Sequence, residues 1–390
     1  MSRPGPLHRL LSAGGVHPFV ALEARAKALA PAGVTPIHFG VGDPREPTPD
    51  FIRAALRDAV PEVSSYPSVA GLPELRRAAA GWLERRSGVR VDPDRQLLPA
   101  NGTKEAVFSL ALAVVDGESD ARRTVVIPSP AYPTYESGAR FAGAEIHRVP
   151  LSSATRWRFD PDQVPDAVWE RTALLWLNVP HNPTGALLDD DAYRNVIERA
   201  RRFGFWVAAD EAYAEVFFHE RPRSALEFGL DNVIALHTLS KRSAMTGYRS
   251  GFMAGDERIL DALRRFRPHL GVATPDFVQH AAIQAWSDDA HADRQRARYA
   301  AKREVMLDYF RRRDWPVEAS EATFYLWMRV PGGDDEAFVD GLLRAGVVAA
   351  PGSFFGEEGR GFVRWALVPT VEQCRAALPR LDAVPDRVAR

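Results

Sequence analysis

The chain has 390 residues, a length that exceeds one small core and favours two domains. Its apolar fraction of 46% and charged fraction of 26% are ordinary for a globular protein, and a formal net charge of −1 provides no basic field for nucleic acid or an anionic membrane surface. The single cysteine, Cys374, excludes an intramolecular disulfide and a cysteine-based metal cluster, so we expect no metal site.

The first 42 residues carry no strong strand pattern, and we expect them to fold back onto a smaller domain. They contain no apolar core of signal-peptide length, and no segment approaches the roughly 18 apolar residues of a membrane span, so we expect a cytoplasmic enzyme. FGVGDP (39–44) has two glycines of a dinucleotide fingerprint but lacks the third. Because a P-loop and an HExxH motif are also missing, nicotinamide, nucleotide and zinc chemistries lose most of their support.

The first chemical signal is NGTKEAVFSLALAVV (101–115), in which a glycine turn opens a helix. The backbone N–H groups of Gly102, Thr103 and Lys104 would point along the helix axis at an anion. The alternative is an ordinary Asn-Gly turn in which Thr103 caps the helix.

Short apolar runs in the middle of the chain predict buried strands; they span 124–130, 173–180, 205–213, 232–240 and 251–255. Between two of them, residues 189–204 place their apolar side chains on one helical face, begin with acidic residues and end at Gly204. Strands separated by a helix of this length predict crossovers in a mostly parallel sheet. The loops that carry chemistry should then lie at the carboxyl ends of the strands.

Two of these loops contain candidate residues. Tyr132, in SPAYPTYE (129–136), would either stack on a planar ring or serve as a core aromatic. Asn182, in NVPHNPTGALL (178–188), would either form a turn with the following proline or present its amide to a cofactor phenolate oxygen.

The next strand ends in an acid, Asp210, which follows the apolar residues 207–209 and is costly to bury without a partner. One interpretation is that Asp210 caps the following turn. The other pairs its carboxylate with a protonated pyridine nitrogen, which makes that ring an electron sink. Tyr213, three residues on, could add a donor to the phenolate oxygen of the same ring.

Lys241 is unusual because only four of the 50 basic residues are lysines, and the other 46 are arginines. Arginine keeps its proton, whereas lysine with a depressed pKa can form an imine with an aldehyde. Lys241 follows the apolar run 232–240, and Thr238, Ser240 and Arg249 supply groups that hold a phosphate. The alternative is a surface charge.

After about residue 280 the pattern changes to a smaller α+β unit. Residues 288–314 predict one long charged helix, 335–346 predict another, and apolar runs at 323–330 and 361–368 predict strands. Within the last run, Arg364 is flanked by apolar residues. It would either bind a substrate carboxylate through both guanidinium nitrogens or form a structural salt bridge.

The joint order of these motifs, with N-x-P-x-N-P-T-G, D-E-x-Y and S-K-x8-R, resembles the class I/II aminotransferases of pyridoxal-phosphate fold type I. The resemblance covers almost the whole chain, from residues 39–49 to the segment around Arg364. It implies an α/β fold: a large domain with a mostly parallel seven-stranded sheet, plus a smaller α+β domain. We expect residues 1–42 and 286–390 to form the small domain and residues 43–285 to form the large, cofactor-binding domain.

The resemblance also implies roles for single residues and pyridoxal 5′-phosphate (PLP) as the cofactor. Lys241 would bind the cofactor aldehyde and move the substrate proton, while Asp210 would pair with the pyridine nitrogen. Tyr213 and Asn182 would bind the ring oxygen, and Tyr132 would stack on the ring. The phosphate would be held by Gly102, Thr103, Lys104, Thr238, Ser240 and Arg249. Gly42, Asn182 and Arg364 would hold the substrate α-carboxylate.

Tyr66, in SYPSVAGLPELR (65–76), matches a family tyrosine that reaches the phosphate of the neighbouring subunit. This match implies a homodimer whose active sites are shared between the subunits. The small-molecule partners would be an amino acid and a 2-oxo acid, which react in turn by a ping-pong scheme.

For the substrate, residues 17–29, 239–256, 267–279 and 285–299 look most similar to succinyldiaminopimelate aminotransferases of lysine biosynthesis, which use glutamate as donor. His17 stands where such sequences often have a tyrosine. An aspartate or broad-specificity aminotransferase is the nearest alternative. A PLP-dependent lyase that eliminates a β- or γ-substituent would share nearly all of these cofactor residues, and a regulatory PLP-binding module is disfavoured because no added DNA-binding domain precedes the fold.

Overall fold

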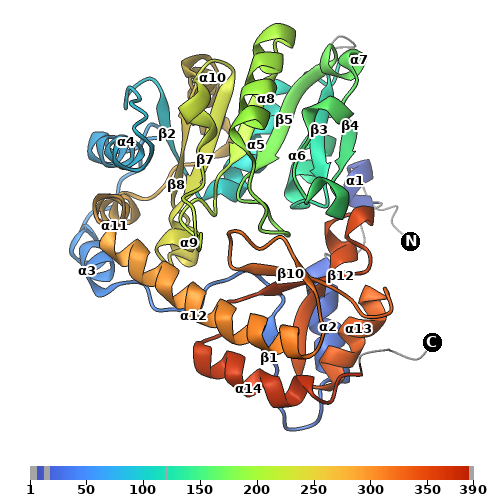
Figure 1. Cartoon of the computed structure of the whole chain (residues 1–390). Coiled ribbons are helices and arrows are strands. Elements are labelled where there is room, and N and C mark those ends of the chain that lie inside the picture. Colours follow the sequence, from blue (N-terminus) through green and yellow to red (C-terminus); the bar gives the residue numbers. More distant parts are fainter. Residues whose placement is uncertain (1–6, 13–17, 119–121, 386–390) are drawn as a thin grey trace, which may run out of the picture.

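The computed structural model describes residues 7–12, 18–118 and 122–385. It contains two β-sheets, a seven-stranded sheet and a five-stranded sheet, which lie in the upper and lower halves of Figure 1. The predicted fold class, with a mostly parallel seven-stranded sheet and a smaller α+β unit, is confirmed. His17, the deviating residue near the start, lies outside the described residues.

The large sheet has the strand order β2-β8-β7-β6-β5-β3-β4. All its neighbouring strands run parallel except for the pairs that involve β8. The strands are β2 (Leu97–Ala100), β3 (Thr124–Ser129), β4 (Glu145–Pro150), β5 (Thr172–Asn178), β6 (Trp206–Asp210), β7 (Val233–Thr238) and β8 (Gly251–Gly255). Every residue of β5 is buried, as expected for a central strand covered on both faces.

Two strands of this sheet escaped the apolar-run pattern. β2 has only four residues and contains Pro99, and β4 (EIHRVP) alternates partly exposed polar residues with apolar ones. Both lie at the ends of the strand order. β2 is apolar and buried but too short to stand out, whereas β4 is partly exposed and therefore more polar, so the pattern identified five strands rather than seven.

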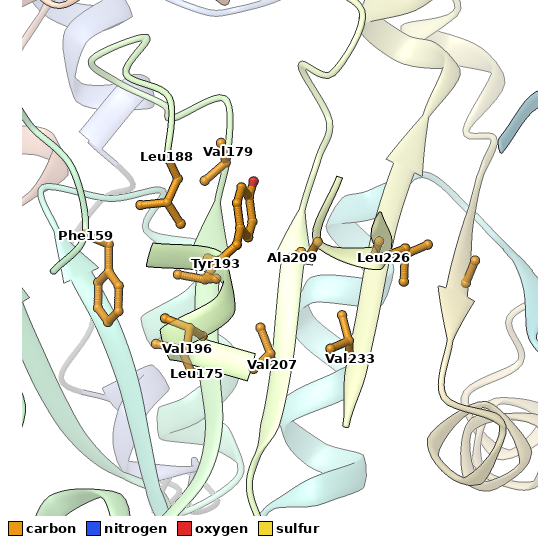
Figure 2. Close-up of a cluster of buried hydrophobic side chains, with 14 of the residues drawn as sticks. Phe159, Leu175, Val179, Leu188, Tyr193, Val196, Val207, Ala209, Leu226 and Val233 are labelled. Carbon is orange, nitrogen blue, oxygen red and sulfur yellow. The ribbon is translucent and has the colours of Figure 1, made fainter. Parts of the chain in front are cut away.

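Helices cover both faces of the large sheet. One face carries α5 (Thr103–Val114), α6 (Thr134–Phe141) and α10 (Glu257–Phe266), and the other carries α4 (Pro73–Ser87), α8 (Asp190–Phe203) and α11 (Asp276–Ser287). Figure 2 shows the second face, where Tyr193 and Val196 of α8 pack on Leu175 and Val207 of the strands below. The predicted helix limits are confirmed, since Asp189 caps α8 and Gly204 ends it with a φ of +77°.

The small sheet has the order β1-β11-β12-β10-β9 and joins the two ends of the chain. Its strands are β1 (Ile37–Phe39), β9 (Val317–Glu318), β10 (Tyr325–Arg329), β11 (Val347–Pro351) and β12 (Phe362–Ala366). β1 pairs with β11 in parallel, so the N-terminal segment does fold back onto the C-terminal unit. Around this sheet lie α2 (Pro18–Leu29), α13 (Asp335–Arg344) and α14 (Val371–Leu381).

The long helix α12 (Ala290–Arg312) runs along the junction between the two sheets (Figure 1). The short helices α1 (Arg9–Ser12), α3 (Asp50–Asp58), α7 (Asp166–Trp169) and α9 (Leu239–Arg242) complete the α-helices of the described chain. None of the described helices is long and apolar enough to cross a membrane. We propose that the domain limits lie at 42/43 and 285/286, next to β1 and within the last turn of α11.

Candidate active site

A cavity with a volume of about 520 Å³ lies at the carboxyl ends of β5, β6 and β7. This size suits a small-molecule site. Of the residues singled out in the sequence, it brings together the following: Gly42, Thr103, Lys104, Tyr132, Asn182, Asp210, Tyr213, Thr238, Ser240, Lys241, Arg249 and Arg364. Two others do not line it, Gly102, which lies just behind Arg249, and Tyr66, which is fully exposed.

Lys241 projects into the cavity from α9, the short helix that directly follows β7. Its Nζ donates a hydrogen bond to the backbone oxygen of Gly42, and Tyr299 donates to the backbone oxygen of Lys241 at 3.3 Å. Burial lowers the pKa of the Lys241 amine from 10.5 to about 8; the carboxylate of Asp43 opposes this shift, and the charges of Arg364 and Arg249 add to it. The amine is therefore neutral, and nucleophilic, at a mildly alkaline pH.

Asp210 is the last residue of β6, and its side chain is buried. One carboxylate oxygen accepts from the hydroxyl of Tyr135 at 2.7 Å, and the other accepts from the backbone N–H of Ala212 at 3.2 Å. The second bond confirms that Asp210 caps the following turn, and its pairing with a pyridine nitrogen stays a prediction. Burial raises the pKa of the Asp210 carboxyl, while these two hydrogen bonds and the charge of Lys241 favour its ionised form.

Two residues that support Asp210 were missed in the sequence. Tyr135 lies one turn after Tyr132 on α6 and stacks on Trp176, with ring centroids 4.7 Å apart. Asn178, the last residue of β5, donates to the backbone oxygen of Asp210 at 2.8 Å. Its side-chain oxygen accepts from the backbone N–H of Asn182 at 2.7 Å. Two features of the sequence could have identified them: Tyr135 is a second tyrosine three residues after Tyr132, and Asn178 is an asparagine at a strand end.

Around the start of α5 the cavity collects donors for an anion. Gly102, and not Thr103, is the N-cap residue of α5, so the capping alternative for Thr103 is wrong. The guanidinium of Arg249 donates to the backbone oxygens of Thr246 at 2.8 Å and Asn101 at 3.2 Å. No carboxylate of the described chain pairs with Arg249. The hydroxyls of Thr238 and Ser240, 2.9 Å apart, lie in the same cavity.

At the opposite end of the cavity lies Arg364, in β12. It donates to the side-chain oxygen of Asn182 at 2.9 Å and to the backbone oxygen of Gly40 at 2.7 Å. Both acceptors are neutral, and no described carboxylate forms an ion pair with this buried cation, so the salt-bridge alternative is wrong. The bond to Asn182 uses that residue's oxygen and leaves its amide N–H groups as donors for the cavity.

Three aromatic rings surround the Arg364 guanidinium. Its central carbon lies 4.2 Å from the ring centroid of Tyr325, 4.5 Å from that of Phe355 and 5.6 Å from that of Phe19. These residues come from β10, from the turn after β11 and from α2, and none was singled out in the sequence. Because rings and neutral oxygens hold this cation and no described carboxylate neutralises it, its charge is available to bind a ligand carboxylate.

The sequence model of the family described as aminotransferase class I and II matches residues 34–381. The chain belongs to this family. PLP is accordingly its cofactor, and the enzyme is a PLP-dependent aminotransferase. The predicted family and cofactor are confirmed.

Similar proteins carry more than one substrate in their names. The 4-dedimethylamino-4-oxo-anhydrotetracycline transaminase OxyQ of Streptomyces rimosus is 38% identical over 368 residues, 93% of this chain and 97% of that protein. LL-diaminopimelate aminotransferase of Syntrophobacter fumaroxidans is 37% identical over 371 residues, 93% and 95% of the two chains. The structure of a probable N-succinyldiaminopimelate aminotransferase of Thermus thermophilus covers 94% of this aminotransferase and 99% of its own chain, with 30% identity and a TM-score of 0.86.

The residues present in the cavity fit PLP chemically. A phosphate suits the start of α5 and Arg249, which packs so closely on Gly102 that a Cβ there would come within 2.5 Å of its Nη2. A pyridinium nitrogen suits the buried carboxylate of Asp210, and an aldehyde suits the amine of Lys241. We name two parts of the cavity by the residues around them. The cofactor end lies around Thr103, Asp210, Tyr213, Thr238, Lys241 and Arg249, and the carboxylate end lies around Phe19, Gly42, Tyr325, Phe355 and Arg364.

Proposed function

We propose that Lys241 is the residue that binds the PLP aldehyde covalently and then carries the proton of the substrate Cα. The observation that carries this assignment is the placement of one amine, with a pKa of about 8, between the cofactor end and the carboxylate end. When bound, PLP withdraws electrons from the substrate Cα. The protein has to supply a base of suitable pKa at that carbon, and the neutral Nζ of Lys241 meets this requirement.

The other assignments follow the predicted roles. We propose that Asp210 pairs with the pyridine nitrogen and that Tyr213 and Asn182 donate to the ring oxygen, while Tyr132 covers the ring. Thr238, Ser240 and Arg249, with the N–H groups of 102–104, hold the phosphate. Arg364 grips the α-carboxylate through the guanidinium nitrogens that now face Asn182 and Gly40.

The finer proposal concerns the far end of the substrate. Lys104 is a third cation at the cavity, its Nζ lies 6.0 Å from the ring centroid of Tyr132, and it forms no ion pair within the described chain. Because the proposed phosphate and α-carboxylate positions already use Arg249 and Arg364, Lys104 is available for a distal carboxylate. This favours glutamate as donor and a substrate of the diaminopimelate type.

We propose N-succinyl-LL-2,6-diaminopimelate as that substrate and 2-oxoglutarate as the acceptor, the pair of reactants used in lysine biosynthesis. The motif resemblance and the Thermus thermophilus structure support this assignment. The second candidate is free LL-diaminopimelate, named by several relatives. It is favoured by Asp43, a carboxylate at the cavity without a hydrogen bond or ion pair from any described side chain, which suits a distal ammonium group.

A half-reaction screen tests these assignments. The PLP form is mixed with one amino donor at a time, and conversion to the pyridoxamine spectrum is followed. We expect fast conversion by glutamate and N-succinyl-LL-diaminopimelate and slow conversion by aspartate. Faster conversion by free LL-diaminopimelate would select the second candidate, and fast conversion by aspartate would move the enzyme to the aspartate or broad-specificity group. Release of pyruvate from a substituted cysteine, without added oxo acid, would indicate a lyase.

We also propose a homodimer with shared active sites. Tyr66 is fully exposed in the single chain, and Val60 and Val63 in the preceding loop are 57% and 82% exposed. Apolar residues at such exposure are typical of an interface with another copy. Sedimentation or scattering should give twice the chain mass, and Tyr66→Phe should weaken PLP binding, because the hydroxyl would reach the phosphate bound by the partner.

A further inference from the structure

Tyr325, the first residue of β10, contacts residues of both ends of the cavity. Its side chain is buried. Its hydroxyl lies 2.8 Å from the hydroxyl of Tyr213, and its ring lies under the guanidinium of Arg364 at 4.2 Å. The same hydroxyl packs so tightly on Gly42 that a Cβ there would approach it to 2.1 Å.

The direction of the hydrogen bond between the two tyrosines follows from counting protons, and this step rests on the proposed function. A tyrosine hydroxyl has one proton to donate. If Tyr213 donates its proton to the ring oxygen of PLP, it can only accept from Tyr325. Tyr325 then has to be the donor, and a hydroxyl that accepts one hydrogen bond becomes a stronger donor in the next. Burial raises the pKa of the Tyr325 hydroxyl, which keeps it protonated for this purpose.

The ring of Tyr325 has a separate effect on Arg364. The guanidinium of Arg364 is held by two hydrogen bonds to neutral oxygens and by packing against aromatic rings. The Tyr325 ring is the nearest of the three aromatic rings around it. It fixes the plane in which the guanidinium can meet a carboxylate with two parallel hydrogen bonds.

We propose that Tyr325 is a positioning residue that acts on both ends of the cavity: its hydroxyl strengthens Tyr213 as a donor, and its ring orients Arg364 for the α-carboxylate. One side chain thereby links the grip on the substrate to the electron demand of the cofactor ring. The two effects are separable, because phenylalanine keeps the ring and lacks the hydroxyl, whereas leucine lacks both.

The first test compares Tyr325→Phe with Tyr193→Phe, a buried tyrosine outside the cavity whose hydroxyl contacts the backbone oxygen of Arg223. The readout is a pH titration of the absorbance of bound PLP. A weaker donor stabilises a negative ring oxygen less, so Tyr325→Phe should raise the pKa of this absorbance change by about half a unit to one unit. Tyr193→Phe should leave it unchanged. An unshifted titration in Tyr325→Phe would overturn the role of the hydroxyl.

The second test separates the ring from the hydroxyl. The KM for glutamate should stay within about twofold of the parent value in Tyr325→Phe and rise about tenfold in Tyr325→Leu, since only leucine removes the surface under Arg364. Equal KM values in the two variants would overturn the role of the ring. For a primary amine without a carboxylate, the two variants should not differ in KM.

The third test does not depend on PLP. Melting temperatures of the cofactor-free parent, Tyr213→Phe, Tyr325→Phe and the double variant form a cycle. If the two hydroxyls are paired, the sum of the two single-variant decreases in melting temperature should exceed the decrease in the double variant. A double-variant decrease equal to that sum would overturn the pairing. A parent that fails to bind PLP at all would refute the proposed function, whereas this cycle still decides whether the two tyrosines act together.

Discussion

The cofactor end and the carboxylate end of the cavity are built in different ways. At the cofactor end, Asp210, Thr238 and Lys241 lie at or just after the ends of parallel strands of one sheet, so the sheet alone brings them together. At the carboxylate end, Gly42, Tyr325 and Arg364 come from the segment after β1 and from two strands of the small sheet. The first end is a local property of strand ends, and the second exists only once the N-terminal segment has docked on the C-terminal unit.

The comparison predicts that a change at the cofactor end abolishes chemistry and leaves the fold intact. Lys241→Ala should lower the rate of transamination by about a thousandfold or more, since it removes the proposed covalent anchor and the proposed base. Borohydride reduction followed by peptide mapping should label Lys241 in the parent and lose that label in the variant. Lys27→Ala is the matched control, because Lys27 is exposed on α2. Retained turnover in Lys241→Ala would refute the proposed role of Lys241 at the cofactor end.

A change to the ion pair that holds the carboxylate end in place should lower the stability of the fold instead. Glu46 follows Gly42 by four residues and forms a close ion pair with the buried amine of Lys302 on α12. Lys302→Met would leave that carboxylate without its cation, with only the hydrogen bond from Gln295 at 3.3 Å, and should cost about 3–5 kcal/mol of unfolding free energy, measured by denaturant titration. Lys27→Met should change it by less than about 0.5 kcal/mol.

Adding Glu46→Gln to Lys302→Met should restore most of the lost stability, because no charge is then buried alone. If Lys302→Met unfolds like the parent, the ion pair does not hold the segment after Gly42, and the carboxylate end is less dependent on α12 than the structure indicates.

Within the carboxylate end, Arg364→Lys keeps the charge and loses the planar fork. The KM for glutamate should rise about 10- to 100-fold with a smaller change in kcat, since hydrogen bonds to a charged group are lost. A primary amine that lacks a carboxylate serves as the control substrate and should react equally with both proteins. A fall in kcat with unchanged KM would mean that Arg364 acts on the chemical step.

The two ends meet at Lys241, and its titration sharpens the comparison. The folded pKa of about 8 lies below the ordinary value of 10.5, so the neutral amine dominates above pH 8. The rate at which cofactor-free protein captures PLP should therefore rise about tenfold per pH unit up to about pH 8 and level off above it. Asp43→Asn should move the break to lower pH, because Asp43 raises this pKa. A break near pH 10.5 would show that burial does not act on this amine.

The smallest expected effect is that of Tyr135→Phe, which removes the hydroxyl bond to Asp210 and keeps the ring stacked on Trp176. We expect kcat to fall about three- to tenfold, since one hydrogen bond to a buried carboxylate is lost. The pKa of the Asp210 carboxyl should rise further, so the loss should grow as pH falls. Tyr193→Phe is again the control, and an equal effect in the two variants would make Tyr135 a packing residue only.

The difference between the two ends also explains what the sequence could predict. Asp210 and Lys241 stand out because an acid and a rare amine each follow an apolar run. The end of a predicted strand then places each residue at the carboxyl edge of the sheet. Tyr325 and Phe19 look like any core aromatic in the sequence, because Arg364, the cation that both rings contact, is remote in sequence. The pair of Glu46 and Lys302 is likewise 256 positions apart, a separation that no local pattern covers.

The scarcity of lysine limits the number of side chains with which an aldehyde can react in this protein. Of the four primary amines on side chains, Lys302 is shut inside the fold, and Lys104 and Lys241 both border the same chamber. The remaining basic surface is guanidinium, apart from Lys27, and guanidinium does not condense with carbonyl compounds as an amine does. A carbonyl reagent that meets this protein therefore finds few side-chain amines: Lys27 on the surface, and Lys104 and Lys241 at the cavity, where burial lowers the pKa of Lys241. The low number of lysines limits side reactions over the rest of the surface.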